Sequence, residues 1–332
     1  MPHSLLTPPL RAAVEQLAAR VPARELAGAA EALSEAYRSA PDRPVPGRAM
    51  LGDAARLAYL VTRFPGTLAA LGSALAAALP HLPAESVEDA MELGSGPGPS
   101  LWALPAAFPA LAHLRLVDAD PRMLAVARDL ATVGGAAARV RVETLVADLR
   151  SLRPERADLV VLSFALGELP EHDRVTVLQR AWQSARVALV LVEPGTSAGF
   201  ARVRDARAWL LAEGARVIAP CPHGDACPMQ PPDWCHFAAR VERTRLHRQL
   251  KHGTLGYEDE KFSYAVFHRS RDDDSASATC ASRVVARPQV RTGLVQLRVC
   301  AAGGLRDVTV SRRRGDTYRA ARHLAWGDAW ER

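Results

Sequence analysis

Three of the five cysteines lie within seventeen residues, Cys221–Phe237, of a chain whose first 220 residues contain none. Cys221, Cys227 and Cys235 are separated by five and by seven residues. Clustered thiols in a reducing compartment are more often metal ligands or catalytic groups than disulfide partners. A closed tetrahedral site needs four ligands. The stretch therefore predicts a metal site whose fourth ligand comes from elsewhere in the chain.

Two further cysteines could complete this site. Cys300 ends an apolar segment that would hold it rigidly as a strand, whereas Cys280 lies in a polar stretch. We therefore expect Cys300 to be the fourth ligand and Cys280 to be a spare thiol. His223 and His236 are alternative ligands.

The spacing favours an iron–sulfur cluster over zinc. Zinc ribbons and knuckles usually carry cysteine pairs only two to four residues apart. Cys221 and Cys227 are each followed by proline, as some iron–sulfur ligands are. A cluster with one thiolate on each iron also needs ligands further apart than a single ion does. We expect iron and sulfur, with zinc as the alternative and unligated thiols as a third possibility.

A second candidate site lies in the segment ELGSGPGPS, Glu92–Ser100, at the end of an apolar stretch. A glycine-rich turn between a strand and a helix lets a ligand approach the backbone, and the helix N-terminus offers free N–H groups. Asp118 ends the next strand-like segment and Asp148 the one after it. An acid in the position of Asp118 can bind ribose hydroxyls. The pattern predicts a nucleotide-type cofactor; a nicotinamide dinucleotide and an empty Rossmann-like fold are the alternatives.

This glycine turn resembles that of the class I S-adenosylmethionine-dependent methyltransferases, E/D-x-G-x-G-x-G, which here begins at Glu92. The resemblance implies that Gly94, Gly96 and Gly98 line the methionine part of the cofactor. It also implies that Asp118 holds the ribose and that Asp148 holds the adenine amino group.

No catalytic residue is assigned from the sequence. The segment Ser163–Glu168 lacks the Asn/Asp-Pro-Pro-aromatic motif of base-amino methyltransferases. Glu168 and Glu193 are candidate acids, and the plainer interpretation of Glu168 is a solvated loop residue.

The elements that position these residues follow from the hydrophobic pattern. Residues 1–84 are expected to be helical. Residues 85–270 alternate strands and helices, which predicts a doubly wound α/β domain with a seven-stranded class I methyltransferase (Rossmann-like) sheet. An iron–sulfur insertion is expected at residues 219–258, a linker at 271–282 and a basic β module at 283–332.

Composition adds weaker indications. The chain has 332 residues, 48% of them hydrophobic, and no run of eighteen apolar residues, so we expect no membrane span. The N-terminal segment lacks the features of a secretory signal, and we expect a cytoplasmic protein that is monomeric when free. The net charge is +6. Basic residues recur in the C-terminal module and on a predicted helix, which favours contact with RNA phosphates; that helix carries Arg240, Arg243, Arg245, Arg248 and Lys251.

Several long segments carry a resemblance to one family. They include VEPGTSAGFARVRDAR, APCPHGDACP, DWCHFAARVERTRLHR, EDEKFSYAVFHR and YRAARHLAWGDAW. They resemble the small-subunit ribosome-assembly, methyltransferase-like proteins of mitochondria and bacteria. The resemblance implies association with small-subunit ribosomal RNA or a pre-ribosomal particle. It also implies a 4Fe–4S cluster on four cysteines, namely Cys221, Cys227, Cys235 and Cys300.

Three functions follow as hypotheses. The chain could be an rRNA methyltransferase, a non-catalytic assembly factor that uses the fold as a binding platform, or a zinc-stapled methyltransferase for a small molecule. The basic clusters disfavour the third.

Overall fold

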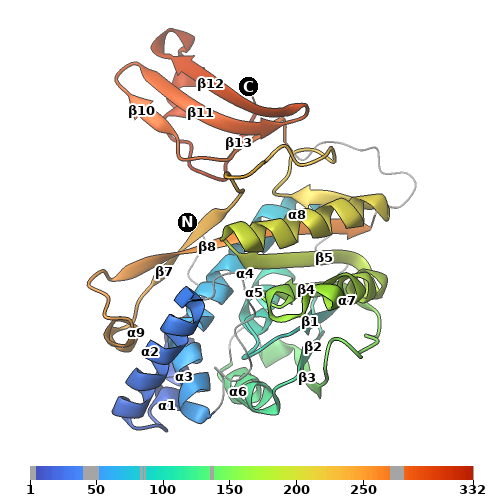
Figure 1. Ribbon diagram of the computed structural model, residues 1–332, viewed down its shortest axis with the longest axis vertical. Coiled ribbons are helices and arrows are strands. Elements are labelled where there is room, and N and C mark those ends of the chain that lie inside the picture. Colours follow the sequence, from blue (N-terminus) through green and yellow to red (C-terminus); the bar gives the residue numbers. More distant parts are fainter. Residues whose placement is uncertain are drawn as a thin grey trace.

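The computed structural model describes residues 5–39, 52–82, 85, 87–134, 138–269 and 280–331. Helices cover both faces of one central sheet, and a smaller β module lies beyond its edge (Figure 1). The predicted N-terminal helical region is confirmed over its described part. It consists of α1 (Pro8–Ala18), α2 (Ala23–Ser39), α3 (Asp53–Thr62), α4 (Phe64–Ala78) and the 3-10 turn η2 (Leu79–His81).

The central sheet has the order β3-β2-β1-β4-β5-β8-β6, with β7 paired to β8. Strand β8 runs antiparallel to both β5 and β6. The strands on the other side of β8 in the sheet pair in parallel, in the order β3, β2, β1, β4 and β5. The predicted class I methyltransferase sheet with an inserted antiparallel strand is therefore confirmed. The strands are β1 (Asp89–Leu93), β2 (His113–Asp118), β3 (Arg141–Val146), β4 (Ala157–Ser163), β5 (Ala185–Pro194), β6 (Ala215–Ala219), β7 (Phe237–Glu242) and β8 (Tyr257–Arg269).

Strands β4 and β5 are nearly continuous apolar runs because both faces of the sheet are covered. Leu159 and Val161 pack into the hydrophobic cluster that contains α4, while Val160 and Leu162 pack into the opposite cluster with α7 and α8. The helices between strands are α5 (Ser100–Ala107), α6 (Pro121–Ala131), the 3-10 turn η5 (Leu166–Glu168), α7 (Glu171–Ser184) and α8 (Ser197–Ala212).

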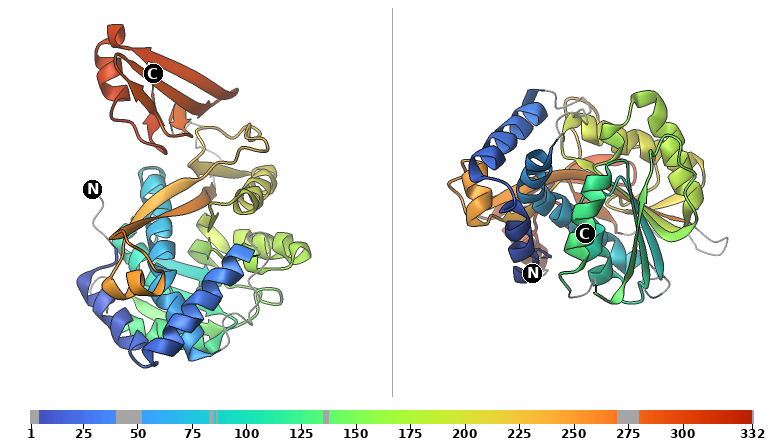
Figure 2. Two further views of the ribbon diagram at one scale, coloured as in Figure 1. Left: turned by 60° about the vertical axis from the view of Figure 1, so that its left-hand side comes forward. Right: turned by 90° about the horizontal axis from the view of Figure 1, so that it is seen from below.

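The basic helix expected after Cys235 is wrong in its first half. Residues 237–242 form strand β7, whose side chains alternate between buried and exposed. A helix, α9, covers only Arg245–Leu250. The apolar residues of β7 face α4 and its side of the core, so period-two burial decides the local structure. Figure 2 shows α9 beside the N-terminal helices α2 and α3.

The C-terminal β module is a second, antiparallel sheet with its own core. Its buried valines and leucines pack against Tyr318 and Trp330. Strands β11 and β12 pair as an antiparallel hairpin within the predicted basic β module. The module consists of β9 (Ser282–Val284), β10 (Gln289–Arg291), β11 (Leu294–Ala301), β12 (Gly304–Ser311), the 3-10 turn η6 (Arg312–Arg314), α10 (Asp316–Ala321) and β13 (Ala329–Trp330).

The predicted linker at 271–282 lies outside the described residues up to position 279. At its far end Ser282 already belongs to β9, because its backbone pairs with Ala301 and Trp330. Within the described ranges, no single helix is long and apolar enough to cross a membrane; only the bent pair of α3 with α4 and η2, at 46°, meets the length and composition together.

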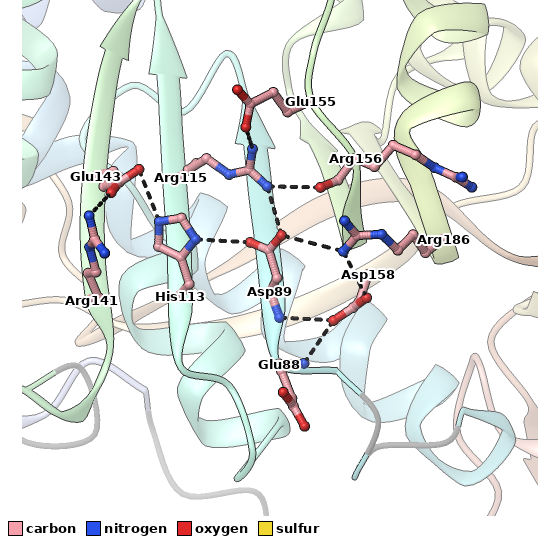
Figure 3. Close-up of polar contacts among 10 residues, drawn as sticks. All are labelled: Glu88, Asp89, His113, Arg115, Arg141, Glu143, Glu155, Arg156, Asp158 and Arg186. Carbon is pink, nitrogen blue, oxygen red and sulfur yellow. Dashed lines mark hydrogen bonds and ion pairs between the residues drawn. The ribbon is translucent and has the colours of Figure 1, made fainter.

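A network of ion pairs and hydrogen bonds between charged residues lies at the amino ends of the parallel strands (Figure 3). Asp89 forms ion pairs with Arg115 at 2.8 Å and with His113 at 3.2 Å. Asp158 accepts hydrogen bonds from the backbone N–H groups of Glu88 and Asp89. This network fastens β1, β2 and β4 together at one end. The opposite, carboxyl end of the sheet is where ligands bind in open α/β folds.

Candidate functional site

The glycine turn between β1 and α5 has left-handed backbone at Gly94, Gly96 and Gly98, with φ of 73°, 53° and 74°. A Cβ on Gly94 would lie 2.8 Å from the Cβ of Ala165, and one on Gly98 would lie 2.9 Å from Leu116. A Cβ on Gly96 would meet nothing within 4 Å. Packing therefore explains Gly94 and Gly98, whereas Gly96 presents bare backbone to open space.

Asp118, at the end of β2, is brought onto this turn. One carboxylate oxygen accepts a hydrogen bond from Gly96 N at 2.7 Å and the other from Asp120 N at 2.8 Å. Burial raises the pKa of Asp118, and the hydrogen bonds from Asp120 and Gly96 act against this rise. Asp118 thus fixes the shape of the turn in addition to the ribose role expected of it.

Glu92 lies directly beneath the turn and is fully buried. Its Oε2 accepts a hydrogen bond from Ser100 N at 3.3 Å, at the start of α5. Burial raises its pKa to about 8. Among the described residues its Oε1 has no hydrogen-bond partner. The same holds for the hydroxyl of Ser95, in the glycine turn, and for that of Ser163, the last residue of β4.

Asp148, expected at the adenine, follows β3 and is engaged elsewhere. Its two oxygens accept from Arg150 Nε at 3.0 and 2.9 Å, and this pairing lowers the pKa of Asp148. A carboxylate held in this way still has lone pairs for an amino group.

The turn after β4 is held by a buried ion pair that sequence reasoning did not find. Glu193 accepts hydrogen bonds from Leu166 N at 3.1 Å and Gly167 N at 3.4 Å, and Arg202 Nε lies 2.6 Å from it. Phe164 has a φ of 57°, an uncommon backbone conformation for a bulky side chain. Strained backbone of this kind concentrates at functional sites.

Glu168 sits on the same turn. It remains accessible to solvent, but surrounding protein atoms and the charge of Glu193 raise its pKa to about 7. A carboxyl with a pKa near neutrality is suited to taking up a proton.

Helix α3 also reaches this end of the sheet, although the N-terminal region carries no catalytic motif. Arg56 Nε donates to Asp120 at 2.7 Å. Tyr59 is enclosed next to Glu168 and Asp118, and burial raises its pKa to about 12. The helical region therefore places two side chains next to the residues that flank the glycine turn.

The four cysteines predicted as ligands line one cavity of about 50 Å³. Three come from the loop between β6 and β7, and Cys300 comes from β11 of the C-terminal module. Cys280 is buried but is absent from this lining. Within the described part of the chain, no three His, Cys, Asp or Glu side chains are grouped so as to hold a single metal ion. What the structure shows is that the four cysteines line the same cavity.

Burial favours the protonated form of three of these thiols, because it raises their pKa. It raises the pKa of Cys221 and of Cys300, the latter to about 12, and raises that of Cys235 well above its ordinary value. Neighbouring cysteines add to the rise at each of the three. A metal bound here would therefore displace protons from the thiols.

Of the two histidines considered as alternative ligands, one lines the cavity and the other does not. His223 lines the cavity, and its Nε2 lies 3.4 Å from the Sγ of Cys300. His236 instead stacks on Trp234 at 5.3 Å and packs edge-on against Trp326 at 4.4 Å.

The basic residues on and around α9 fall into two groups, those paired with acids and those lining an open groove. Arg240 binds both oxygens of Asp259, at 2.8 and 3.1 Å, and Arg243 and Lys251 bind Glu258. Three of the five cations expected to contact RNA phosphates are therefore already paired with acids on β8. An open groove beside them is lined by Arg245, Arg248, Gln249, His252 and Gly253.

The strand order and the glycine turn define a class I methyltransferase fold with an added cysteine-lined junction. The chain belongs to the family described as mitochondrial small ribosomal subunit Rsm22, whose model matches residues 53–331.

Two curated relatives support this assignment. The human "Ribosome assembly protein METTL17, mitochondrial" is 29% identical over 289 residues, which cover 82% of this chain and 61% of that protein. "Rsm22-cox11 tandem protein 2, mitochondrial" of Schizosaccharomyces pombe is 25% identical over 293 residues, covering 72% of this chain and 38% of that protein. The chain thus spans less than two thirds of the length of either relative.

A solved magnesium protoporphyrin IX methyltransferase from Synechocystis with bound SAM is 15% identical, with a TM-score of 0.40, and the match covers 62% of this chain and 80% of that one. The fold is assigned from the strand order above and not from this superposition.

Proposed function

We propose that this chain binds S-adenosylmethionine at the glycine turn, holds a 4Fe–4S cluster and acts on the small ribosomal subunit, through its rRNA or a pre-ribosomal particle. The observation that carries the proposal is the convergence of four cysteines from two distant segments on one cavity. The ligands proposed are Cys221, Cys227, Cys235 and Cys300. Membership of the Rsm22 family and the likeness to METTL17 support a ribosomal partner.

The residues around the cavity fit an iron–sulfur cluster. Thiolates are the ligands such clusters use. Met229, Phe200 and Val285 form a small hydrophobic cluster against three of these cysteines, Cys227, Cys235 and Cys300, which would exclude water from the site. Cys300 belongs to the module and the other three to the methyltransferase domain, so a bound cluster would fasten the two together. Metal binding of this kind stabilises the folded state directly.

The residues around the glycine turn fit the methyl donor. Gly96 presents its backbone to open space, and unpartnered polar atoms of Glu92, Ser95 and Ser163 lie in the segments around the turn. The donor supplies an activated methyl group when bound. The chain's own residues hold the turn, through Asp118, and the β4 segment, through Glu193.

Glu168 is the group best placed to accept a proton from a methylated nucleophile. The turn that carries it touches the glycine turn, because Ala165 lies against Gly94. The Glu193–Arg202 pair fixes the backbone just before Glu168 and so would position its carboxyl.

A platform without methyl transfer is the second candidate function. Both oxygens of Asp118 are already satisfied by the chain's own backbone, so the turn keeps its shape without a ligand. The basic module would then contact RNA while the methyltransferase fold only carries it.

Cosedimentation with small ribosomal subunits and pre-ribosomal particles tests the ribosomal part of the proposal. Wild type should cosediment, and Cys300→Ser should cosediment at least tenfold less, because the module is no longer fastened. Cys280→Ser is the matched control and should behave as wild type. Equal association of Cys300→Ser and wild type would contradict the proposal. Transfer of labelled methyl groups to the particles separates the enzyme from the platform.

The cytoplasmic location and the monomeric free state remain predictions of the sequence. The relatives' names place METTL17 and the tandem protein in mitochondria, and they describe those proteins.

A further inference from the structure

Two arginines face the cysteine cavity, one from each side of the domain junction. Arg207 lies on α8 and is only 4% exposed, and Arg283 lies on β9 at the start of the C-terminal module. Both line the cavity together with the four cysteines. They belong to different parts of the fold, so only the folded chain brings their charges together.

Arg207 is buried without a carboxylate to balance it. One Nη donates a hydrogen bond to the carbonyl oxygen of His223 at 2.7 Å, and the side chain also hydrogen-bonds the thiol of Cys221. In the described part of the chain its Nε has no hydrogen-bond partner and it forms no ion pair. Burying an unpaired guanidinium is costly, and such charges are normally paired.

Arg283 is held in place by backbone carbonyls. Its Nε donates to Pro220 at 2.9 Å and one Nη to Gly327 at 3.0 Å. These bonds use two of its five N–H donors and orient the guanidinium without neutralising it. Arg204 lines the cavity as well, but it is paired with Asp205 at 3.1 Å. Among the described residues that line the cavity, Arg207 and Arg283 are therefore the cations without a carboxylate partner, and no Asp or Glu lies in the lining.

We infer that Arg207 and Arg283 balance the charge of the metal-loaded cysteine centre and thereby set its redox potential. The inference rests on the proposed cluster. An oxidised 4Fe–4S core carries two positive charges and its four thiolates carry four negative ones, leaving a net charge of two minus. Two guanidinium groups neutralise it. One-electron reduction adds a further negative charge, so nearby cations favour the reduced form and raise the potential.

Both arginines are positioning residues that act on the cluster through its cysteines. The charge of the environment and hydrogen bonds to the sulfurs are established determinants of cluster potential. Because Arg207 is anchored in the methyltransferase domain and Arg283 in the module, the reduced and oxidised forms would hold the junction with different strength.

The test compares anaerobically purified full-length proteins by iron and sulfide content and by potentiometric titration. Arg207→Met removes the charge at similar volume, and Arg207→Lys retains it. Arg240→Met is the matched control, because Arg240 lies outside the cavity lining and is paired with Asp259 at 2.8 Å. Arg283→Met provides a second route to the same charge change if Arg207→Met fails to fold.

We expect the reduction equilibrium of Arg207→Met to shift about tenfold toward the oxidised form, which is about 59 mV for one electron. Arg207→Lys should stay close to wild type, and Arg240→Met should not differ from it. Loss of iron from Arg207→Met and not from Arg207→Lys would equally support the inference.

A fully loaded Arg207→Met or Arg283→Met protein with the wild-type potential would overturn the inference and leave the proposed cluster standing. Wild type without iron and sulfide would overturn both. The two failures are thus distinguishable.

Discussion

Glu92 offers a sharp test of the glycine-turn site, because its carboxyl is buried and only one of its oxygens accepts a backbone hydrogen bond. Glu92→Gln keeps the shape of a protonated glutamate and removes the ionisation. Its carbonyl oxygen would still accept from Ser100 N. The substitution should therefore stabilise the fold wherever wild-type Glu92 is forced to ionise.

The sign follows from the direction of the pKa change. Burial raises the pKa of Glu92 from an ordinary 4.5 to about 8, so the folded state binds this proton more tightly than the unfolded state does. The stabilising contribution is complete below pH 4.5 and is lost as the pH rises through about 8. Between these values, wild type should lose about 1.4 kcal/mol per pH unit relative to Glu92→Gln.

The assay is urea unfolding at pH 5, 6, 7 and 8, followed by tryptophan fluorescence, with Trp102 on the adjoining helix α5. From pH 5 to pH 7 the difference in unfolding free energy between the two proteins should change by about 3 kcal/mol in favour of the variant. Glu213→Gln, at the exposed end of α8, is the matched control and should track wild type. A difference that does not change with pH would refute the reasoning and show that Glu92 is ionised in the folded protein.

Three further predictions concern the turn, the opposite end of the sheet and the basic module. Gly94→Ala should abolish binding of S-adenosylmethionine in a calorimetric titration, because its Cβ would collide with Ala165, whereas Gly214→Ala, at a φ of 80° in open space, should bind normally; equal binding would contradict the site. Asp89→Asn should lower the unfolding free energy by about 1–3 kcal/mol without changing donor binding, because it leaves Arg115 with a weakened partner. Replacing Arg312–Arg314 by glutamine should weaken RNA binding and reduce the slope of log affinity against log salt by about 2, at about 0.7 per phosphate contact in single strands; Arg240→Gln, already paired with Asp259, should leave that slope unchanged.

Local patterns account for the parts of the fold that were predicted correctly. The apolar runs of β4 and β5 indicate strands buried on both faces, and the glycine turn marks the first strand-to-helix connection. Cys300 stands on a strand whose alternation with Leu297 and Val299 is visible in the sequence. Each of these signals is contained within a dozen neighbouring residues.

The misread segment shows where local patterns compete. In residues 237–242 the buried Phe237, Ala239 and Val241 alternate with exposed residues, but the arginines and histidines that follow suggested a longer helix. Packing against α4 decides between the two, and packing is not visible before the fold is known.

Other features of the site depend on contacts between distant segments. Glu193 and Arg202 are brought together by the return from β5 into α8, and Arg56 reaches Asp120 from the N-terminal helices. The missing partner of Arg207 is equally invisible in the sequence, because every nearby acid is a candidate until the structure excludes it. That the charge of Arg207 is buried without a carboxylate partner could be identified only from the folded chain.

The most direct test of the account is metal and sulfide analysis of the anaerobically purified protein together with its absorption spectrum. We expect about four irons and four sulfides per chain in wild type, with a broad absorption band, and their loss in Cys300→Ser. Stoichiometric zinc without iron, or iron that persists unchanged in Cys300→Ser, would contradict it.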